Sequence, residues 1–182
     1  MILLRSKLSG VTGKALEAFA ASAQKAVKLR GEISVLVTSS NEIQKLNRDF
    51  RHKNKPTDVL SFPSEATGLA GDIAISAEIA KENAQRLRHS ALTELKILIL
   101  HGILHLAGHD HESDNGEMAT LEAKLRAKFE LPLGLIARTH EAVAPAKKAA
   151  AKSAAKGTKK TVRKSAAVKP ARAAQRSPES KR

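Results

Sequence analysis

The sequence contains no cysteine, tryptophan or tyrosine, and only four phenylalanines among 182 residues. Without cysteine the chain can form neither a disulfide framework nor a thiolate metal site. This excludes disulfide-stapled secreted scaffolds and cysteine-based zinc fingers. Long apolar runs are also missing. Residues 95–106 are interrupted by Lys96, His101 and His105 and fall short of the roughly 20 residues that span a bilayer. We therefore expect no membrane partner.

The N-terminal apolar run, residues 2–4, is too short for a secretory signal, and no charged segment precedes it. A cytoplasmic location is the expectation that follows.

Charge is distributed unevenly along the chain. The whole sequence carries a formal net charge of +14, of which residues 144–182 hold +12 and residues 1–143 only +2. The chain is thus a nearly neutral body followed by a strongly basic tail.

Residues 1–142 are expected to form one domain in which strands and helices alternate. Alternating β-branched residues predict the strands, and apolar residues at helical spacing predict the helices. Helices are expected to begin after N-caps at Ser39, Ser76, Ser90 and Ser113. Two helices are expected to end at Gly31 and Gly108. The expected strands are 2–4, 32–38, 58–62 and 71–75, and the expected helices are 14–29, 40–47, 77–87 and 91–107, with a last one from 113. Residues 51–56 are expected to form a loop, and 131–136 to pack the end of the body.

Four of the seven histidines fall within residues 101–111. His101 and His105 are four residues apart on the expected helix, so their rings share one face. Gly108 can adopt a left-handed conformation that turns the chain back and brings His111 to the same point. Three neutral imidazoles and a water molecule form a catalytic zinc site with an open position. His109 is expected to point outward or into the surroundings of the site, and Asp110 either orients a ligand ring or is an exposed turn acid.

This spacing equals that of zinc proteases, in which a glutamate beside the first histidine is the general base. That position holds Gly102 here, which disfavours a peptidase. A zinc ion can still activate water and polarise a phosphoryl oxygen. Arg51 and Lys53, in a basic segment, are candidates for binding the phosphate, although the segment can equally be a solvated loop.

Three ordered motifs resemble the YbeY family of bacterial endoribonucleases. The first comprises residues 46–51 and 56–63, the second residues 71–73, and the third residues 101–111. The resemblance extends over roughly residues 1–140.

This resemblance implies an α+β fold with a small mixed sheet, surrounding helices and a histidine cluster on a central helix. It implies one Zn²⁺ ion bound by His101, His105 and His111, with Arg51 as the functional arginine. The implied activity is zinc-dependent cleavage of single-stranded RNA in 16S ribosomal RNA 3′-end maturation and ribosome quality control, with ribosomal RNA and the small subunit as partners. The family usually has tyrosine where this chain has His109, which leaves open a fourth ligand. No general base is evident in the sequence, and the two candidates are Asp110 and a neighbouring water.

Residues 143–182 are expected to be a disordered tail, since they contain no leucine, isoleucine or phenylalanine to form a core. Thirteen cations on a flexible chain predict non-specific, salt-sensitive binding to nucleic acid. The alternative is a tail that only keeps the protein soluble. For the whole protein, the alternatives to an endoribonuclease are a non-catalytic RNA-binding assembly factor with a structural metal and, less favoured, a metal-dependent peptidase.

Overall fold

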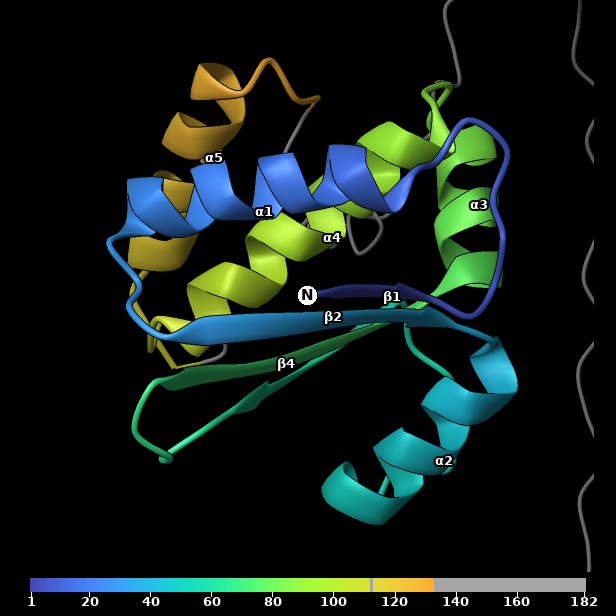
Figure 1. Ribbon diagram of the computed structural model, residues 1–182, viewed down its shortest axis with the longest axis horizontal. Coiled ribbons are helices and arrows are strands. Elements are labelled where there is room, and N and C mark those ends of the chain that lie inside the picture. Colours follow the sequence, from blue (N-terminus) through green and yellow to red (C-terminus); the bar gives the residue numbers. More distant parts are fainter. Residues whose placement is uncertain (112, 133–182) are drawn as a thin grey trace, which may run out of the picture. The chain divides into compact units, whose positions relative to one another are not determined.

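A computed structural model describes residues 1–111 and 113–132 of the protein. The expected domain boundary after residue 142 and the basic tail lie outside the described residues. Within them, strands and helices alternate along the chain (Figure 1) in the order β1 (Ile2–Leu4), α1 (Gly13–Val27), β2 (Glu32–Thr38), α2 (Ser40–Arg51), β3 (Val59–Pro63), β4 (Leu69–Ser76), α3 (Ala77–Arg86), α4 (Ala91–Leu106) and α5 (Glu117–Lys128).

The four strands form one mixed sheet in the order β1-β2-β4-β3. β1 and β4 both pair with β2 in parallel, whereas β3 pairs with β4 in antiparallel orientation. A small mixed sheet with surrounding helices confirms the expected α+β class. β2 and β4 are thus the two inner strands of the sheet.

The two faces of the sheet are covered by different helices (Figure 1). Side chains alternate along β4, with Ile73 and Ile75 in the main core and Ala74 in a second, smaller core. The main core lies on the side of α1, α3, α4 and α5. The smaller core packs Ile43 of α2 against Leu60 of β3.

Helix α4 is the centre of the main core. It contacts β3, β4, α1, α3 and α5, and most of its residues are buried. A helix that is apolar around most of its circumference requires such surroundings. Histidines within α4 are therefore held on a rigid support.

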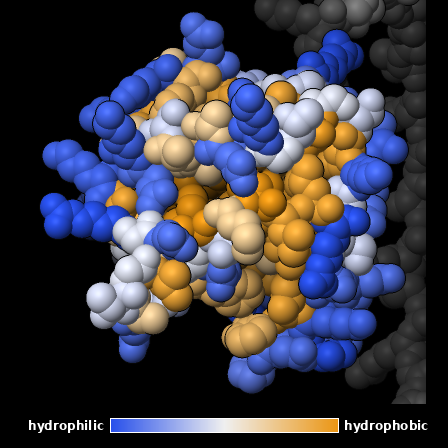
Figure 2. All heavy atoms as spheres, in the orientation of Figure 1, coloured by the Kyte–Doolittle hydropathy of each residue, from blue (hydrophilic) through white to orange (hydrophobic). Residues whose placement is uncertain are grey.

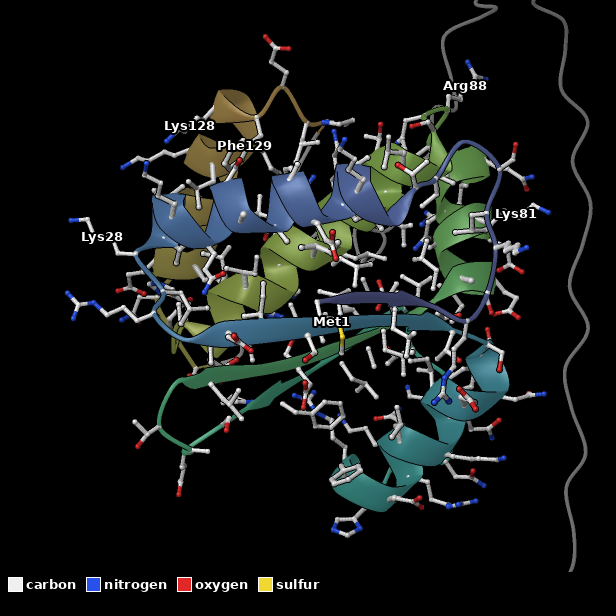
Figure 3. All side chains as sticks on the ribbon, viewed as in Figure 1. Met1, Lys28, Lys81, Arg88, Lys128 and Phe129 are labelled. Atoms are coloured by element: carbon white, nitrogen blue, oxygen red, sulfur yellow. The ribbon has the colours of Figure 1, made fainter. Side chains whose placement is uncertain are left out.

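The outer helices carry polar side chains, and apolar ones reach the surface between them (Figure 2). In Figure 3, Lys28 and Lys81 project away from the body. The Phe129 ring instead lies edge-on to Phe19 of α1, with 5.3 Å between ring centroids, and so fastens the end of α5 to α1. No helix in the described ranges has the length and apolar character needed to cross a membrane.

Three of the expected N-caps are confirmed. The hydroxyls of Ser39, Ser76 and Ser90 accept hydrogen bonds from backbone N–H groups in the first turns of α2, α3 and α4. The cap expected at Ser113 is wrong. Helix α5 begins at Glu117, and the Asp114 carboxylate accepts hydrogen bonds from the backbone N–H groups of Gly116 and Met118, at 2.8 and 2.7 Å.

Two helix ends also differ from expectation. Helix α1 ends at Val27 because Lys28 itself adopts a left-handed conformation, with φ of 61°. Gly31 instead lies where the chain enters β2, and a Cβ there would be 2.8 Å from the Ala70 nitrogen. Helix α2 continues four residues past Asn47, and the loop expected from Arg51 begins at His52, whose φ is 56°.

The expected packing of residues 131–136 can be followed only at its start. Leu131 packs against the main core, and residues 133–136 lie outside the described part of the chain.

Candidate metal centre

Two histidines of α4 and one from the following loop converge at a single point. His101 and His105 lie one turn apart, with 3.1 Å between their Nε2 atoms. The ring centroid of His111 is 5.4 Å from the centroid of each of the other two. One ligand nitrogen from each ring lies within 4.8 Å of the others. The predicted convergence of three imidazoles is confirmed.

The turn at Gly108 brings His111 back to the helix. Gly108 has φ of 87°, the left-handed conformation that the sequence predicts. The backbone N–H of Gly108 donates to the His105 carbonyl and that of His109 to the Leu104 carbonyl, at 3.0 and 3.1 Å. These bonds close the end of α4 and fix the direction in which the chain leaves it.

Two of the three ligand nitrogens have the separation that a tetrahedral metal ion requires. Zinc–nitrogen bonds of about 2.0–2.1 Å at tetrahedral angles separate two ligand nitrogens by about 3.3 Å. The 3.1 Å separation between the Nε2 atoms of His101 and His105 is close to this value. Burial, followed by the charges of His101 and His111, lowers the pKa of His105 from 6.5 to about 4. His105 is therefore neutral near pH 7, which is the form that binds a metal.

A buried carboxylate lies behind the cluster. Glu122 of α5 accepts a hydrogen bond from Nδ1 of His101 at 3.2 Å, and its other oxygen accepts from Nε of Arg126 at 2.8 Å. The sequence left Asp110 either as an acid that orients a ligand ring or as an exposed turn acid, and Glu122 was missed. Asp110 accepts a hydrogen bond from the Ser113 hydroxyl at 2.9 Å, and it lines the cleft described next.

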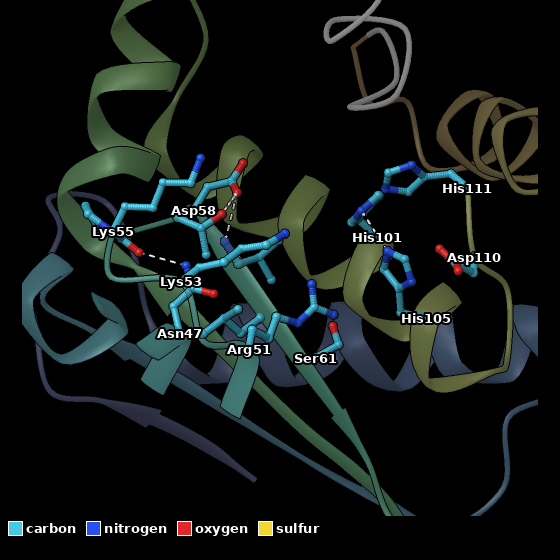
Figure 4. Close-up of a pocket in the computed structure, with 14 residues that line it drawn as sticks. Asn47, Arg51, Lys53, Lys55, Asp58, Ser61, His101, His105, Asp110 and His111 are labelled. Atoms are coloured by element: carbon cyan, nitrogen blue, oxygen red, sulfur yellow. Dashed lines mark hydrogen bonds between the residues drawn. The ribbon is translucent and has the colours of Figure 1, made fainter. Parts of the chain in front are cut away.

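The histidines open onto a cleft of about 700 Å³. Its opposite side is built by the end of α2 and the loop before β3, and Arg51 reaches across it toward the histidines (Figure 4). The amide of Asn47, which is 3% exposed, donates to the Lys55 carbonyl at 2.7 Å and holds this loop in place. The cleft is lined by Asn47, Arg51, Lys53, Lys55, Pro56, Thr57, Asp58, Val59, Leu60, Ser61, His101, His105, Asp110 and His111.

All five predicted site residues line this one cleft, although Arg51 is the last residue of a helix and not a loop residue. His109 lies outside both the histidine cluster and the cleft lining, as far as the described residues extend. Gly102, the position of a peptidase base, faces the sheet. A Cβ there would lie 2.8 Å from Cδ1 and 3.0 Å from Cγ2 of Ile73, so a larger residue would force the Ile73 side chain or α4 to shift.

A family model described as Endoribonuclease YbeY matches residues 4–130 of the chain. A relative from Koribacter versatilis, named Endoribonuclease YbeY, is 59% identical over 150 residues, covering 82% of this chain and 97% of the relative. A relative of the same name from Solibacter usitatus is 52% identical over 124 residues, which cover 68% of this chain and 84% of the relative. The solution structure of a Thermotoga maritima protein aligns with a TM-score of 0.49 and 30% identity, over 81% of this chain and 100% of that one. The match to the family model includes the whole cleft.

Proposed function

The chain belongs to the YbeY family of endoribonucleases, and on this premise we propose that it is a zinc-dependent endoribonuclease that cleaves single-stranded RNA. The observation that carries the proposal is the arrangement of the cleft. Three imidazoles with nitrogens within 4.8 Å of one another face an arginine and two lysines across an open space. Substrate phosphate and a metal ion can meet there.

We assign His101, His105 and His111 as the ligands of one Zn²⁺ ion. When bound, such an ion activates a water molecule and draws charge from a phosphoryl oxygen. Three protein ligands leave a position open, as in catalytic zinc sites, whereas structural sites are closed by four. This favours an enzyme over an assembly factor with a structural metal.

The basic side of the cleft binds and orients the RNA backbone. Arg51 is exposed at the end of α2, so its guanidinium is available to hold a phosphate group through two parallel hydrogen bonds. Lys53 adds a second positive charge from the adjoining loop. The body has little net charge, and these local cations are therefore what concentrates RNA at the histidines.

The finer role rests on the three sequence motifs. We propose that the protein acts in the cytoplasm on ribosomal RNA, at the 3′ end of 16S RNA and in ribosome quality control, with the small subunit as partner. Residues 1–142 are proposed to be the enzyme domain, and residues 143–182 a basic arm that holds RNA non-specifically.

Replacing one ligand tests the proposal. We expect the zinc-loaded wild-type protein to cleave single-stranded RNA, and His101→Ala to lose both stoichiometric zinc and cleavage. The matched control is His109→Ala, which alters a neighbouring histidine outside the cluster and is expected to keep both. The measurements are zinc content, RNA cleavage and circular dichroism of each purified variant.

Cleavage of RNA by a folded His101→Ala protein would overturn the catalytic assignment and favour the assembly factor. Cleavage of peptides but not of RNA by the wild-type protein would revive the peptidase.

A further inference from the structure

A chain of buried polar groups runs from the histidine cluster into the protein. His101, Glu122 and Arg126 are 5%, 1% and 2% exposed. One carboxylate oxygen of Glu122 accepts from His101, and the other accepts from Arg126. Arg126 in turn donates through Nη1 to the Pro132 carbonyl at 2.8 Å. Two side chains thus connect a predicted metal ligand to the backbone at Pro132.

The connection determines which nitrogen of His101 faces the cleft. A carboxylate next to an arginine is ionised and accepts hydrogen bonds only, so Nδ1 of His101 carries the proton. Nε2 then holds the lone pair, and it is this atom that lies 3.1 Å from Nε2 of His105. His101 therefore presents a ligand nitrogen to the point at which the three rings converge.

We propose that Glu122 is a positioning residue of the metal centre, a role that rests on the proposed function. It fixes the tautomer and ring orientation of His101 and increases the basicity of Nε2. A carboxylate behind a ligand histidine commonly strengthens metal binding in this way. Arg126 holds the carboxylate in place and compensates its charge within the core.

The chain offers a matched control in a second histidine–glutamate pair, of which the glutamate is buried. Nε2 of His89 lies 2.8 Å from Oε2 of Glu94, whose side chain is 0% exposed. Glu94 belongs to the first turn of α4, on the same helix as His101 but outside the cluster and the cleft. Glu94→Gln therefore removes a comparable buried charge without touching the proposed ligands.

The test measures metal affinity of the full-length protein rather than activity. Zn²⁺ affinity is determined by competition with a chelator, and the visible absorption of the Co²⁺-substituted protein reports the ligand field. We expect Glu122→Gln to bind Zn²⁺ about 10- to 100-fold more weakly and to shift the Co²⁺ bands. Glu94→Gln is expected to keep the wild-type affinity and spectrum.

A second variant separates the positioning of His101 by Glu122 from the neutralisation of the Arg126 charge by the same carboxylate. Glu122→Gln leaves the Arg126 cation buried without its carboxylate, which destabilises the fold. Adding Arg126→Gln removes that cation. We expect the double variant to regain stability against urea but to retain the weakened affinity and shifted spectrum.

Wild-type Zn²⁺ affinity in Glu122→Gln or in the double variant would overturn the positioning role and leave the proposed function untouched. A wild-type protein that binds no metal at all would overturn the proposed function itself, together with this role.

Discussion

Arg51 is the residue of the basic side that reaches furthest toward the histidines (Figure 4). We expect Arg51→Ala to lower kcat/KM for RNA cleavage about 100-fold, because removing one preorganised donor to a developing charge has effects of this order. Arg51→Lys keeps the charge but loses the two-pronged geometry, so we expect a smaller loss of about 10-fold. Steady-state cleavage of a short single-stranded RNA measures both.

The control for Arg51 is Arg48→Ala on the same helix. Arg48 is exposed, pairs with Asp49 at 2.9 Å and does not line the cleft. The Arg48→Ala protein is expected to cleave RNA at the wild-type rate. Equal losses in the Arg48 and Arg51 variants would mean that general surface charge, and not a positioned guanidinium, binds the phosphate.

At the residue scale, spacing alone predicts that the three histidines converge. Positions four apart on a helix share a face, and Gly108 lets the chain turn back toward the helix. Glu122 comes from a helix that follows later in the chain, and its contact with His101 depends on how α5 packs. A weak signal existed in the sequence. Glu122 and Arg126 form an i, i+4 ion pair on the same face of α5 as the buried Met118 and Leu125. Charges on a core-facing side require a buried partner.

At the element scale, helix α5 carries Glu122, and its N-terminus is fixed by Asp114. We expect Asp114→Ala to lower the free energy of unfolding by about 1 kcal/mol, the usual cost of losing an N-terminal cap. Urea denaturation measures this loss. Ser113→Ala removes the cap that the sequence suggests and is expected to change the free energy of unfolding by a few tenths of a kcal/mol at most. The reverse order of the two effects would restore Ser113 as the cap.

The interiors of the elements are predicted better than their ends. Alternation places Glu32–Thr38 in a strand with the observed bounds, because one face of β2 is buried in the core. Ends depend on single residues whose backbone adopts a left-handed conformation. Lys28 and His52 do so without being glycine, and composition gives no sign of this. Helix α2 is therefore longer than expected, and this places Arg51 on a helix.

At the scale of the whole molecule, positive charge and chemistry lie in different parts of the sequence. We expect deletion of residues 144–182 to weaken RNA binding and flatten its salt dependence, because thirteen cations no longer displace counterions. Binding titrations at several salt concentrations give the slope, and zinc content reports whether the histidine site is retained, as we expect.

A full-length variant with the nine tail lysines replaced by glutamine distinguishes charge from chain length. This variant is expected to bind RNA as weakly, and with as flat a salt dependence, as the deletion does. A salt slope equal to that of the wild-type protein in both variants would leave the tail with no part in holding RNA.

The order of the strands in the sheet was not predicted from the residues. Local patterns identify strands but not their neighbours, and β2 pairs with β4 across an intervening helix and strand. Gly71 illustrates the tertiary constraint. Its φ is 140°, and a Cβ there would lie 2.3 Å from the Phe62 carbonyl oxygen on the neighbouring strand. The motif contains this glycine, but only the pairing of β3 with β4 explains it.

The position of the sheet in the sequence has a consequence for biosynthesis. All four strands lie within residues 2–76, whereas the histidines of the cluster begin at residue 101 and Glu122 follows later still. A chain that leaves the ribosome N-terminus first exposes every strand before any of these side chains. The predicted metal site can therefore be completed only after every strand of the sheet has been synthesised.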